Sequence, residues 1–317
     1  MRLYGVDSQL AAFRASVAGG RLPHAWLLAG PRGVGKASFA VQMAELILDA
    51  ESPDSPGAKL IAAGSHPDFL RMERLINDKT DKLARSITID QVRAMRQMLT
   101  TGTSIATRRV IVVDAADDLE GRGGPNALLK SLEEPPANTI FLLISHQPGR
   151  LLPTIRSRCR TLMFSPLDDA AMTSVLGKHL PDLDPAKRAQ LIGAASGSPA
   201  TALAYARIDT ATLDDALAEL ANTGDPTNAV RSRLAQSLAL KAALPQYEAF
   251  LDRAPAFIAD RARRSEGPAL DAALNAWGRA RTLSQIAVPQ SLIPETVVFD
   301  MAGIVAGLAQ AGRAAKA

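Results

Sequence analysis

The chain has 317 residues, of which 47% are apolar and 21% are charged, and its formal net charge is +4 at pH 7. This length allows two or three domains with sizeable cores, and no apolar run approaches the roughly 18 residues of a membrane span. The single cysteine, Cys159, excludes an internal disulfide framework and fits a reducing compartment.

The charge pattern and the first residues set expectations about partners and location. Lys and Arg are scattered rather than grouped in blocks, which permits contact with a polyanion without demanding it. The first seven residues, MRLYGVD, lack the apolar core of a signal peptide. We therefore expect a cytoplasmic protein with no membrane partner.

Residues 1 to about 165 alternate between patterns typical of helices and of strands. Apolar runs at 25–29, 109–114, 139–145 and 160–164 predict four strands, and helical apolar spacing separates them. Because such strands must be buried on both faces, they predict a parallel sheet covered by helices on each side.

From about residue 166 the pattern changes to Ala- and Leu-rich helices without clear strands. A first helical block runs to about Arg207, and a second follows the polar stretch 222–226. The expected domains are an α/β domain at 1–165, a small helical domain at 166–208 and an all-α domain at 209–317.

The sequence GPRGVGKA at residues 30–37 matches a phosphate loop in all but its last position. Glycines allow backbone N–H groups to converge on phosphate, and Lys36 can reach the outer phosphates. Ala37 stands where a Ser or Thr hydroxyl would hold magnesium. Ser38 does not replace that hydroxyl, because one step along a helix turns a side chain by about 100°.

A second element of such a site is a carboxylate at the end of an apolar strand, and Asp114 fits this role. Ala115 follows it, where many ATPases carry a glutamate that activates water. We interpret Asp117 and Asp118 as solvated carboxylates at the start of the next turn. The candidate nucleotide-binding residues are Gly30, Pro31, Gly33, Val34, Gly35, Lys36, Ala37, Ser38 and Asp114.

The segment LLPTIRSRC at 151–159, with the strand before it, resembles the clamp-loader branch of the AAA+ superfamily, in which Ser-Arg-Cys is a signature. The resemblance implies that Arg158 is an arginine finger, acting in trans on the nucleotide of a neighbouring subunit. On composition alone, the favoured role of Arg158 would instead be that of a surface arginine that stabilises a helix C-terminus.

Segments 22–28, 66–68 and 127–136 resemble the delta-prime subunits of bacterial DNA polymerase III clamp loaders, over residues 1 to 207. That family implies a RecA-like AAA+ module, a helical lid and a helical collar, in a subunit that does not itself hydrolyse ATP. It implies an accessory subunit of a polymerase holoenzyme, with motor subunits tau/gamma and the delta subunit as partners. The sliding clamp and primed DNA are implied partners within the assembly.

The chain departs from the family pattern at three places. Residues 49 to 65 contain no cysteine, so the four-cysteine zinc module of many relatives is not expected. The lid motif Gly-Ser-x-Arg becomes Gly-Ser-Pro-Ala at 197–200, so its arginine is absent. The sensor-1 position falls at Ser145 or His146. We expect that no cofactor is required. The sequence is compatible with a loop that binds ATP or ADP without hydrolysing it, and equally with an empty loop that side chains block.

Two other function classes stay open from the sequence. An active AAA+ ATPase, such as a motor subunit or remodelling factor, would turn over ATP in dependence on Lys36, and Ala37, Ala115 and Ala200 speak against it. A nucleic-acid-binding scaffold would bind primed DNA with a steep salt dependence, which the scattered charge disfavours.

Overall fold

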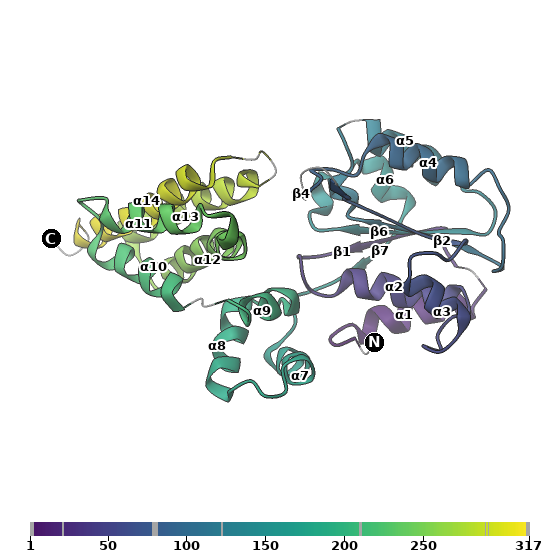
Figure 1. Cartoon of the computed structure of the whole chain (residues 1–317), viewed down its shortest axis with the longest axis horizontal. Helices are drawn as coiled ribbons and strands as arrows, with labels where there is room; N and C mark the ends of the chain where they lie inside the picture. The colour runs from purple at the N-terminus through teal and green to yellow at the C-terminus, as the bar shows by residue number, and fades with distance from the viewer. Residues whose placement is uncertain are drawn as a thin grey trace. The chain divides into compact units, whose positions relative to one another are not determined.

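A computed structural model of the chain describes residues 3–20, 22–77, 82–121, 123–208, 211–288, 290 and 292–314. The chain divides into two compact units, Met1–Thr201 and Ala202–Ala317. The expected boundaries at residues 165 and 208 stay predictions, and residue 209 lies outside the described residues. In what is described, the first unit holds the sheet and the second unit is helical (Figure 1).

The sheet of the first unit has five strands, and every neighbouring pair is parallel. In spatial order the strands are β2 (Phe69–Glu73), β5 (Arg109–Asp114), β6 (Thr139–Ser145), β1 (Ala25–Ala29) and β7 (Arg160–Met163). Strands β1 and β6 are buried along their whole length, and β5 is buried up to its last residue. The predicted parallel sheet is therefore confirmed.

Two elements of the sheet region were not expected from the sequence. The edge strand β2 is buried only at Phe69 and Met72, and it carries the charged side chains Arg71 and Glu73. It therefore lacks the apolar run that revealed the other strands. A short antiparallel pair, β3 (Ile76–Asn77) and β4 (Lys82–Leu83), follows it.

Helices cover both faces of the sheet (Figure 1). One face carries α1 (Asp7–Ala18), α2 (Lys36–Ile47) and α3 (Pro56–Ala62), and the other carries α4 (Ile89–Met98), α5 (Gly123–Glu133) and α6 (Pro153–Arg158). Side chains alternate along β1, so Leu27 joins the core beneath α4, α5 and α6, whereas Trp26 packs against Phe13 of α1 with ring centroids 4.7 Å apart. The 3₁₀ helices η1 (Ala116–Asp118) and η2 (Pro148–Arg150) follow β5 and β6.

The rest of the chain is helical where the structure describes it. The remaining elements are α7 (Asp169–His179), α8 (Pro185–Ala195), α9 (Pro199–Tyr205), α10 (Ala211–Thr223), α11 (Ala229–Leu238), η3 (Lys241–Ala243), α12 (Leu244–Arg263), α13 (Gly267–Ala287) and α14 (Pro294–Ala314). In the second unit Arg253 forms a two-point ion pair with Asp214 and lies 5.1 Å from the ring centroid of Tyr205. None of the described helices is both long enough and apolar enough to span a membrane.

Candidate functional site

The phosphate loop runs from the end of β1 to the start of α2, as predicted. It therefore lies at the carboxyl ends of the parallel strands, where ligands bind in open sheets of this kind. Gly33 and Gly35 have φ angles of +76° and +98°, a region that glycine adopts without strain. The N–H of Gly30 donates to the Ser145 carbonyl at 3.2 Å, which joins the loop to the end of β6.

Lys36 is held by the loop that contains it. The residue is only 3% exposed, and Nζ donates to the carbonyl of Gly30 at 2.6 Å and to that of Pro31. Burial lowers the pKa of Lys36 to about 8, although the charges of Asp117 and Asp114 oppose the shift. The ammonium group is thus committed to the protein's own carbonyl oxygens.

The first turn of α9 packs directly on this loop. The N–H of Ala200 donates to the Gly33 carbonyl at 3.2 Å. A Cβ atom on Gly33 would lie 2.1 Å from Ser198 Oγ and 3.0 Å from the Ala200 Cβ, so a larger residue there would force Ser198 to move. Ala200 is the position at which the sequence resemblance implies an arginine in ATPases of the family. This turn therefore approaches the loop with backbone and small side chains, and its first residues bring no cation.

Asp114 at the end of β5 is already paired. Its Oδ2 lies 2.8 Å from Nη2 of Arg71 on β2, and the same nitrogen lies 2.9 Å from Oε2 of Glu73. Ala37 offers no oxygen ligand. With a methyl group at one ligand position and an ion-paired carboxylate at the other, these residues do not fit the magnesium that a phosphate-loop ATPase uses.

The sequence interpretation of Asp117 and Asp118 as solvated carboxylates was wrong, because both are half-buried. Helix η1 turns back toward the end of β6, where Asp117 accepts hydrogen bonds from Ser145 Oγ at 2.8 Å and from the His146 N–H. Asp118 lies 3.2 Å from Nε of Arg74. Burial raises the pKa of Asp118, and the charge of Arg74 opposes this.

The two sensor-1 candidates have different environments. Ser145 is fully buried and donates to Asp117. Burial lowers the pKa of His146 to about 4, with a further contribution from the positive charge of Lys36. His146 is therefore a neutral imidazole at neutral pH.

The strand pairing fixes where Arg158 lies relative to the phosphate loop. Strand β7 begins at Arg160, and Arg160 pairs with Trp26 near the start of β1, whereas the loop leaves β1 after Ala29. Because a parallel strand rises about 3.3 Å per residue, roughly 10 Å or more along the sheet separates the two places. Arg158 thus lies at the amino ends of the strands, opposite the loop of its own chain.

Arg158 is partly exposed and makes two polar contacts within its own chain. Its Nη2 lies 2.8 Å from Oε1 of Glu133, and its Nη1 donates to the Thr154 carbonyl at 2.9 Å. The Arg158 and Glu133 side chains are 35% and 42% exposed. Cys159, the third residue of the triplet, packs against the core, and burial raises its pKa to about 12, so it is not a reactive thiol.

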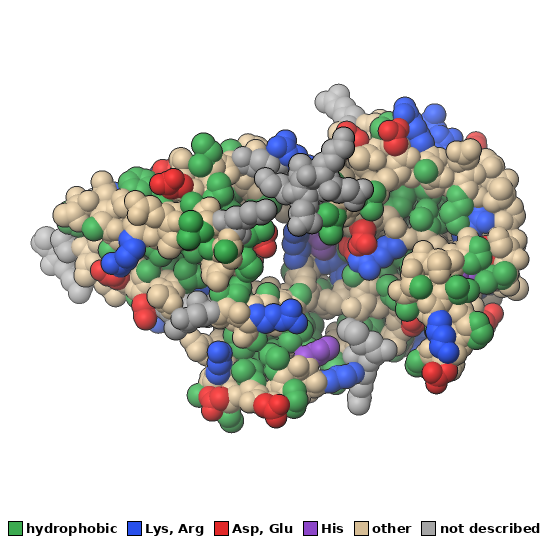
Figure 2. Space-filling view, viewed as in Figure 1, with side chains coloured by type: hydrophobic (Ala, Val, Ile, Leu, Met, Phe, Trp, Pro, Cys, Tyr) green, Lys and Arg blue, Asp and Glu red, His purple; other side chains and the backbone are tan. Residues whose placement is uncertain are grey.

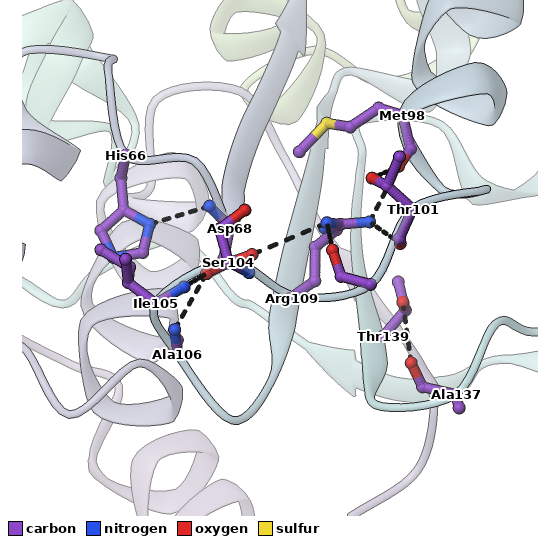
Figure 3. Close-up of polar contacts among 11 residues, drawn as sticks. His66, Asp68, Met98, Thr101, Ser104, Ile105, Ala106, Arg109, Ala137 and Thr139 are labelled. Carbon is purple, nitrogen blue, oxygen red and sulfur yellow. Dashed lines mark hydrogen bonds and ion pairs between the residues drawn. The ribbon is translucent and has the colours of Figure 1, made fainter.

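The motif His66-Pro67-Asp68 forms a buried polar cluster (Figure 3). The Asp68 carboxylate accepts hydrogen bonds from the backbone N–H groups of residues 104–106 at 2.8 to 2.9 Å. It lies 3.6 Å from the guanidinium of Arg109, which donates to the carbonyls of residues 98, 101 and 102. The cluster orders the segment that leads into β5.

The chain is similar in sequence to subunits of bacterial DNA polymerase III. The family described as DNA polymerase III, delta subunit, matches residues 5–168, about half of the chain. DNA polymerase III subunit delta' of Pseudomonas aeruginosa is 39% identical over 194 residues, covering 58% of this chain and 56% of that protein. The corresponding subunit of Escherichia coli is 32% identical over 223 residues, covering 67% and 64%. The chain thus matches less than two thirds of the length of each of these two relatives.

A solved structure supports the fold over almost the whole chain. The gamma subunit-related protein of DNA polymerase III from Thermotoga maritima matches with a TM-score of 0.53 at 15% identity, covering 95% of this chain and 99% of that one. The expected fold class, an α/β module with a parallel sheet followed by helices, is confirmed.

Proposed function

Because the chain belongs to the family of DNA polymerase III delta-prime subunits, we propose that it works as the delta-prime subunit of a bacterial clamp loader. Such a complex loads the sliding clamp onto primed DNA. Its partners here are the motor subunits tau/gamma and the delta subunit, with the clamp and DNA contacted in the assembly. In this role the chain is a cytoplasmic accessory subunit of the polymerase holoenzyme rather than a catalyst by itself.

We also propose that the nucleotide site of this chain does not hydrolyse ATP, whether or not the site binds a nucleotide. Three features support this: the methyl group of Ala37, the pairing of Asp114 with Arg71, and Ala115 in place of a water-activating glutamate. Since hydrolysis needs the metal and an oriented water together, the loss of both removes the reaction.

Arg158 is proposed to complete the ATP site of an adjacent motor subunit. The observation that carries this proposal is its place at the amino ends of the strands, away from the phosphate loop of its own chain. Exposed ion pairs contribute only about 0–1 kcal/mol, so Arg158 can exchange Glu133 for a phosphate group. A guanidinium binds phosphate oxygens by two parallel hydrogen bonds, which are stronger.

The test is Arg158→Ala in a clamp loader reconstituted from the full-length chain and its partner subunits. We expect the clamp- and DNA-dependent ATP turnover at the site that Arg158 reaches to fall by about 10³-fold or more, as for other arginine fingers. Total turnover then falls only by that site's share, and clamp loading falls with it. Single-turnover hydrolysis in the assembled complex measures the slow site directly.

Arg156→Ala is the matched control, because Arg156 lies two residues away on the same helix and is exposed. It should leave turnover and loading unchanged. Arg158→Lys keeps the charge without the planar fork and should retain only part of the activity. Unchanged turnover and loading by Arg158→Ala in an intact complex would remove the finger role.

Contact with DNA is proposed only within the assembly. Among the described side chains on the face drawn in Figure 2, Lys and Arg occur at several separate places rather than in one continuous patch. Affinity for a polyanion grows with the number of phosphates that are neutralised together, so this face offers no strong independent site for DNA.

A further inference from the structure

We propose that the guanidinium of Arg71 is a built-in counter-cation of the degenerate nucleotide site, taking the charge-neutralising role that magnesium has in active phosphate-loop ATPases. The inference deepens the proposal that this site does not hydrolyse ATP and rests on that part of the proposed function. Its consequence is that the first unit keeps its shape without metal or nucleotide.

The geometry resembles coordination by two carboxylates around one positive centre. A single nitrogen, Nη2 of Arg71, lies 2.8 Å from an oxygen of Asp114 and 2.9 Å from an oxygen of Glu73. The parallel pairing of β2 with β5 places Glu73 directly beside Asp114. The sheet register therefore brings the two carboxylates together, and Arg71 lies between them.

The alternation of side chains places this cluster on the face of the sheet that α2 covers. Met72 and Val113 belong to the core beneath α4, α5 and α6. Their neighbours Arg71, Glu73 and Asp114 therefore extend from the opposite face, the one that carries the phosphate-loop helix. The charge of Asp114 also acts on the pKa of Lys36, so the cluster borders the phosphate loop.

Two of the other cations near the site already have partners, and Arg32 of the loop is exposed. Lys36 is bound to the carbonyls of its own loop, and Arg74 pairs with Asp118. The side chain of Asp114 is only 16% exposed, and an ionised carboxylate at such a place is costly without a counter-charge. Without Arg71, the adjacent carboxylates of Asp114 and Glu73 would have no cation between them, and a divalent cation would be one way to neutralise them.

The experiment uses Mn²⁺, a spectroscopic substitute for Mg²⁺, titrated into the full-length chain while electron paramagnetic resonance measures the free ion. We expect Arg71→Gln to bind one Mn²⁺ at least about tenfold more tightly than the parent, because repulsion by a cation near 4 Å exceeds that factor at intermediate dielectric. Mg²⁺ should compete and should raise the Tm of this variant but not that of the parent.

Three further variants make the test specific. Arg71→Gln/Asp114→Asn should lose the added Mn²⁺ site, and Arg71→Lys, which keeps a cation, should behave as the parent does. Arg14→Gln makes the same change of charge at the exposed pair of Arg14 with Glu51 and should gain no site.

Mn²⁺ binding by Arg71→Gln that is no tighter than in the parent, or that persists with Asp114→Asn, would overturn the inference. If Arg71→Gln does not fold, the charge-balanced variant Arg71→Gln/Asp114→Asn should fold, and failure of both would also overturn it. These measurements use the chain alone, so their failure leaves the test of Arg158 in the assembled complex untouched.

Discussion

At the scale of single residues, Asp68 shows how a buried charge can stabilise local structure. It is fully buried, and burial alone would raise its pKa, but three backbone N–H donors and Arg109 outweigh burial and hold the pKa below its ordinary value. The ionised form is therefore the one that the folded chain binds. The sequence singled out this motif only through the family resemblance, and the structure gives it a physical role.

We predict that Asp68→Asn lowers the free energy of unfolding of the first unit at pH 7 by roughly 3–5 kcal/mol, because Arg109 is left buried without its counter-charge. Urea unfolding followed by the fluorescence of Trp26 measures this, in a Trp277→Phe background so that the second unit does not contribute. Asp54→Asn, at an exposed carboxylate, is the control and should change little.

The same pair predicts a pH dependence. A carboxylate whose folded pKa is lowered contributes stability above its unfolded pKa of about 4, and this contribution is lost as the pH falls through the folded pKa. The parent should therefore lose stability below about pH 4 more steeply than Asp68→Asn. Parallel stability curves for the two proteins between neutral and acid pH would contradict this assignment.

Individual site residues differ in how far the sequence could reveal them. The sequence reveals that Ala37 and Ala115 lack a functional group, because the motif specifies which chemical group belongs at each position. Arg71 gave no signal, since it belongs to a short edge strand and meets Asp114 only through strand pairing. Asp117 was misread because its partners, Ser145 and His146, come from a neighbouring strand end.

At the scale of elements, the central feature is the packing of α9 on the phosphate loop. We predict that Gly33→Ala destabilises the first unit more than Gly35→Ala does. Both substitutions force a side chain into the left-handed region, which costs about 1–2 kcal/mol. Only the Cβ on Gly33 also collides with Ser198, so its cost should be greater by at least about 1 kcal/mol.

Gly35→Ala is a matched control, because nothing lies within 4 Å of a Cβ at that position. Urea unfolding gives the two costs, and hydrogen exchange of the α9 amides locates the difference. Exchange in α9 should quicken in Gly33→Ala and remain as in the parent in Gly35→Ala. Equal costs and equal exchange would mean that α9 does not depend on this contact.

At the scale of the whole molecule, the two ends of the sheet have different properties. At the carboxyl ends of the strands, Lys36, Asp114 and Asp117 are all bonded to other groups of the chain. At the amino ends, Arg158 is half-exposed and is held by a surface ion pair with Glu133 and a hydrogen bond to the Thr154 carbonyl. The proposed action of Arg158 on a neighbouring subunit relies on this difference between the two ends.

We predict that the purified full-length chain has no magnesium-dependent ATP turnover above background, since neither a metal ligand at position 37 nor a water activator at position 115 is present. Lys36→Ala should therefore leave the measured phosphate release unchanged. Turnover by the parent that Lys36→Ala abolishes would instead identify an active ATPase. The measurement is steady-state phosphate release with and without Mg²⁺.

The sequence by itself determined the α/β class, the phosphate loop and the missing chemical groups at positions 37, 115 and 200. Such features depend on local patterns: apolar runs, glycine spacing and the identity of a side chain in a motif. Only the tertiary structure decided which polar groups meet. Strand register and the return of loops to the sheet bring together Arg71 with Asp114, Asp117 with Ser145, and Asp68 with Arg109. These contacts join residues that lie 28 to 43 positions apart in the sequence. A local sequence pattern cannot show that two such distant residues are in contact.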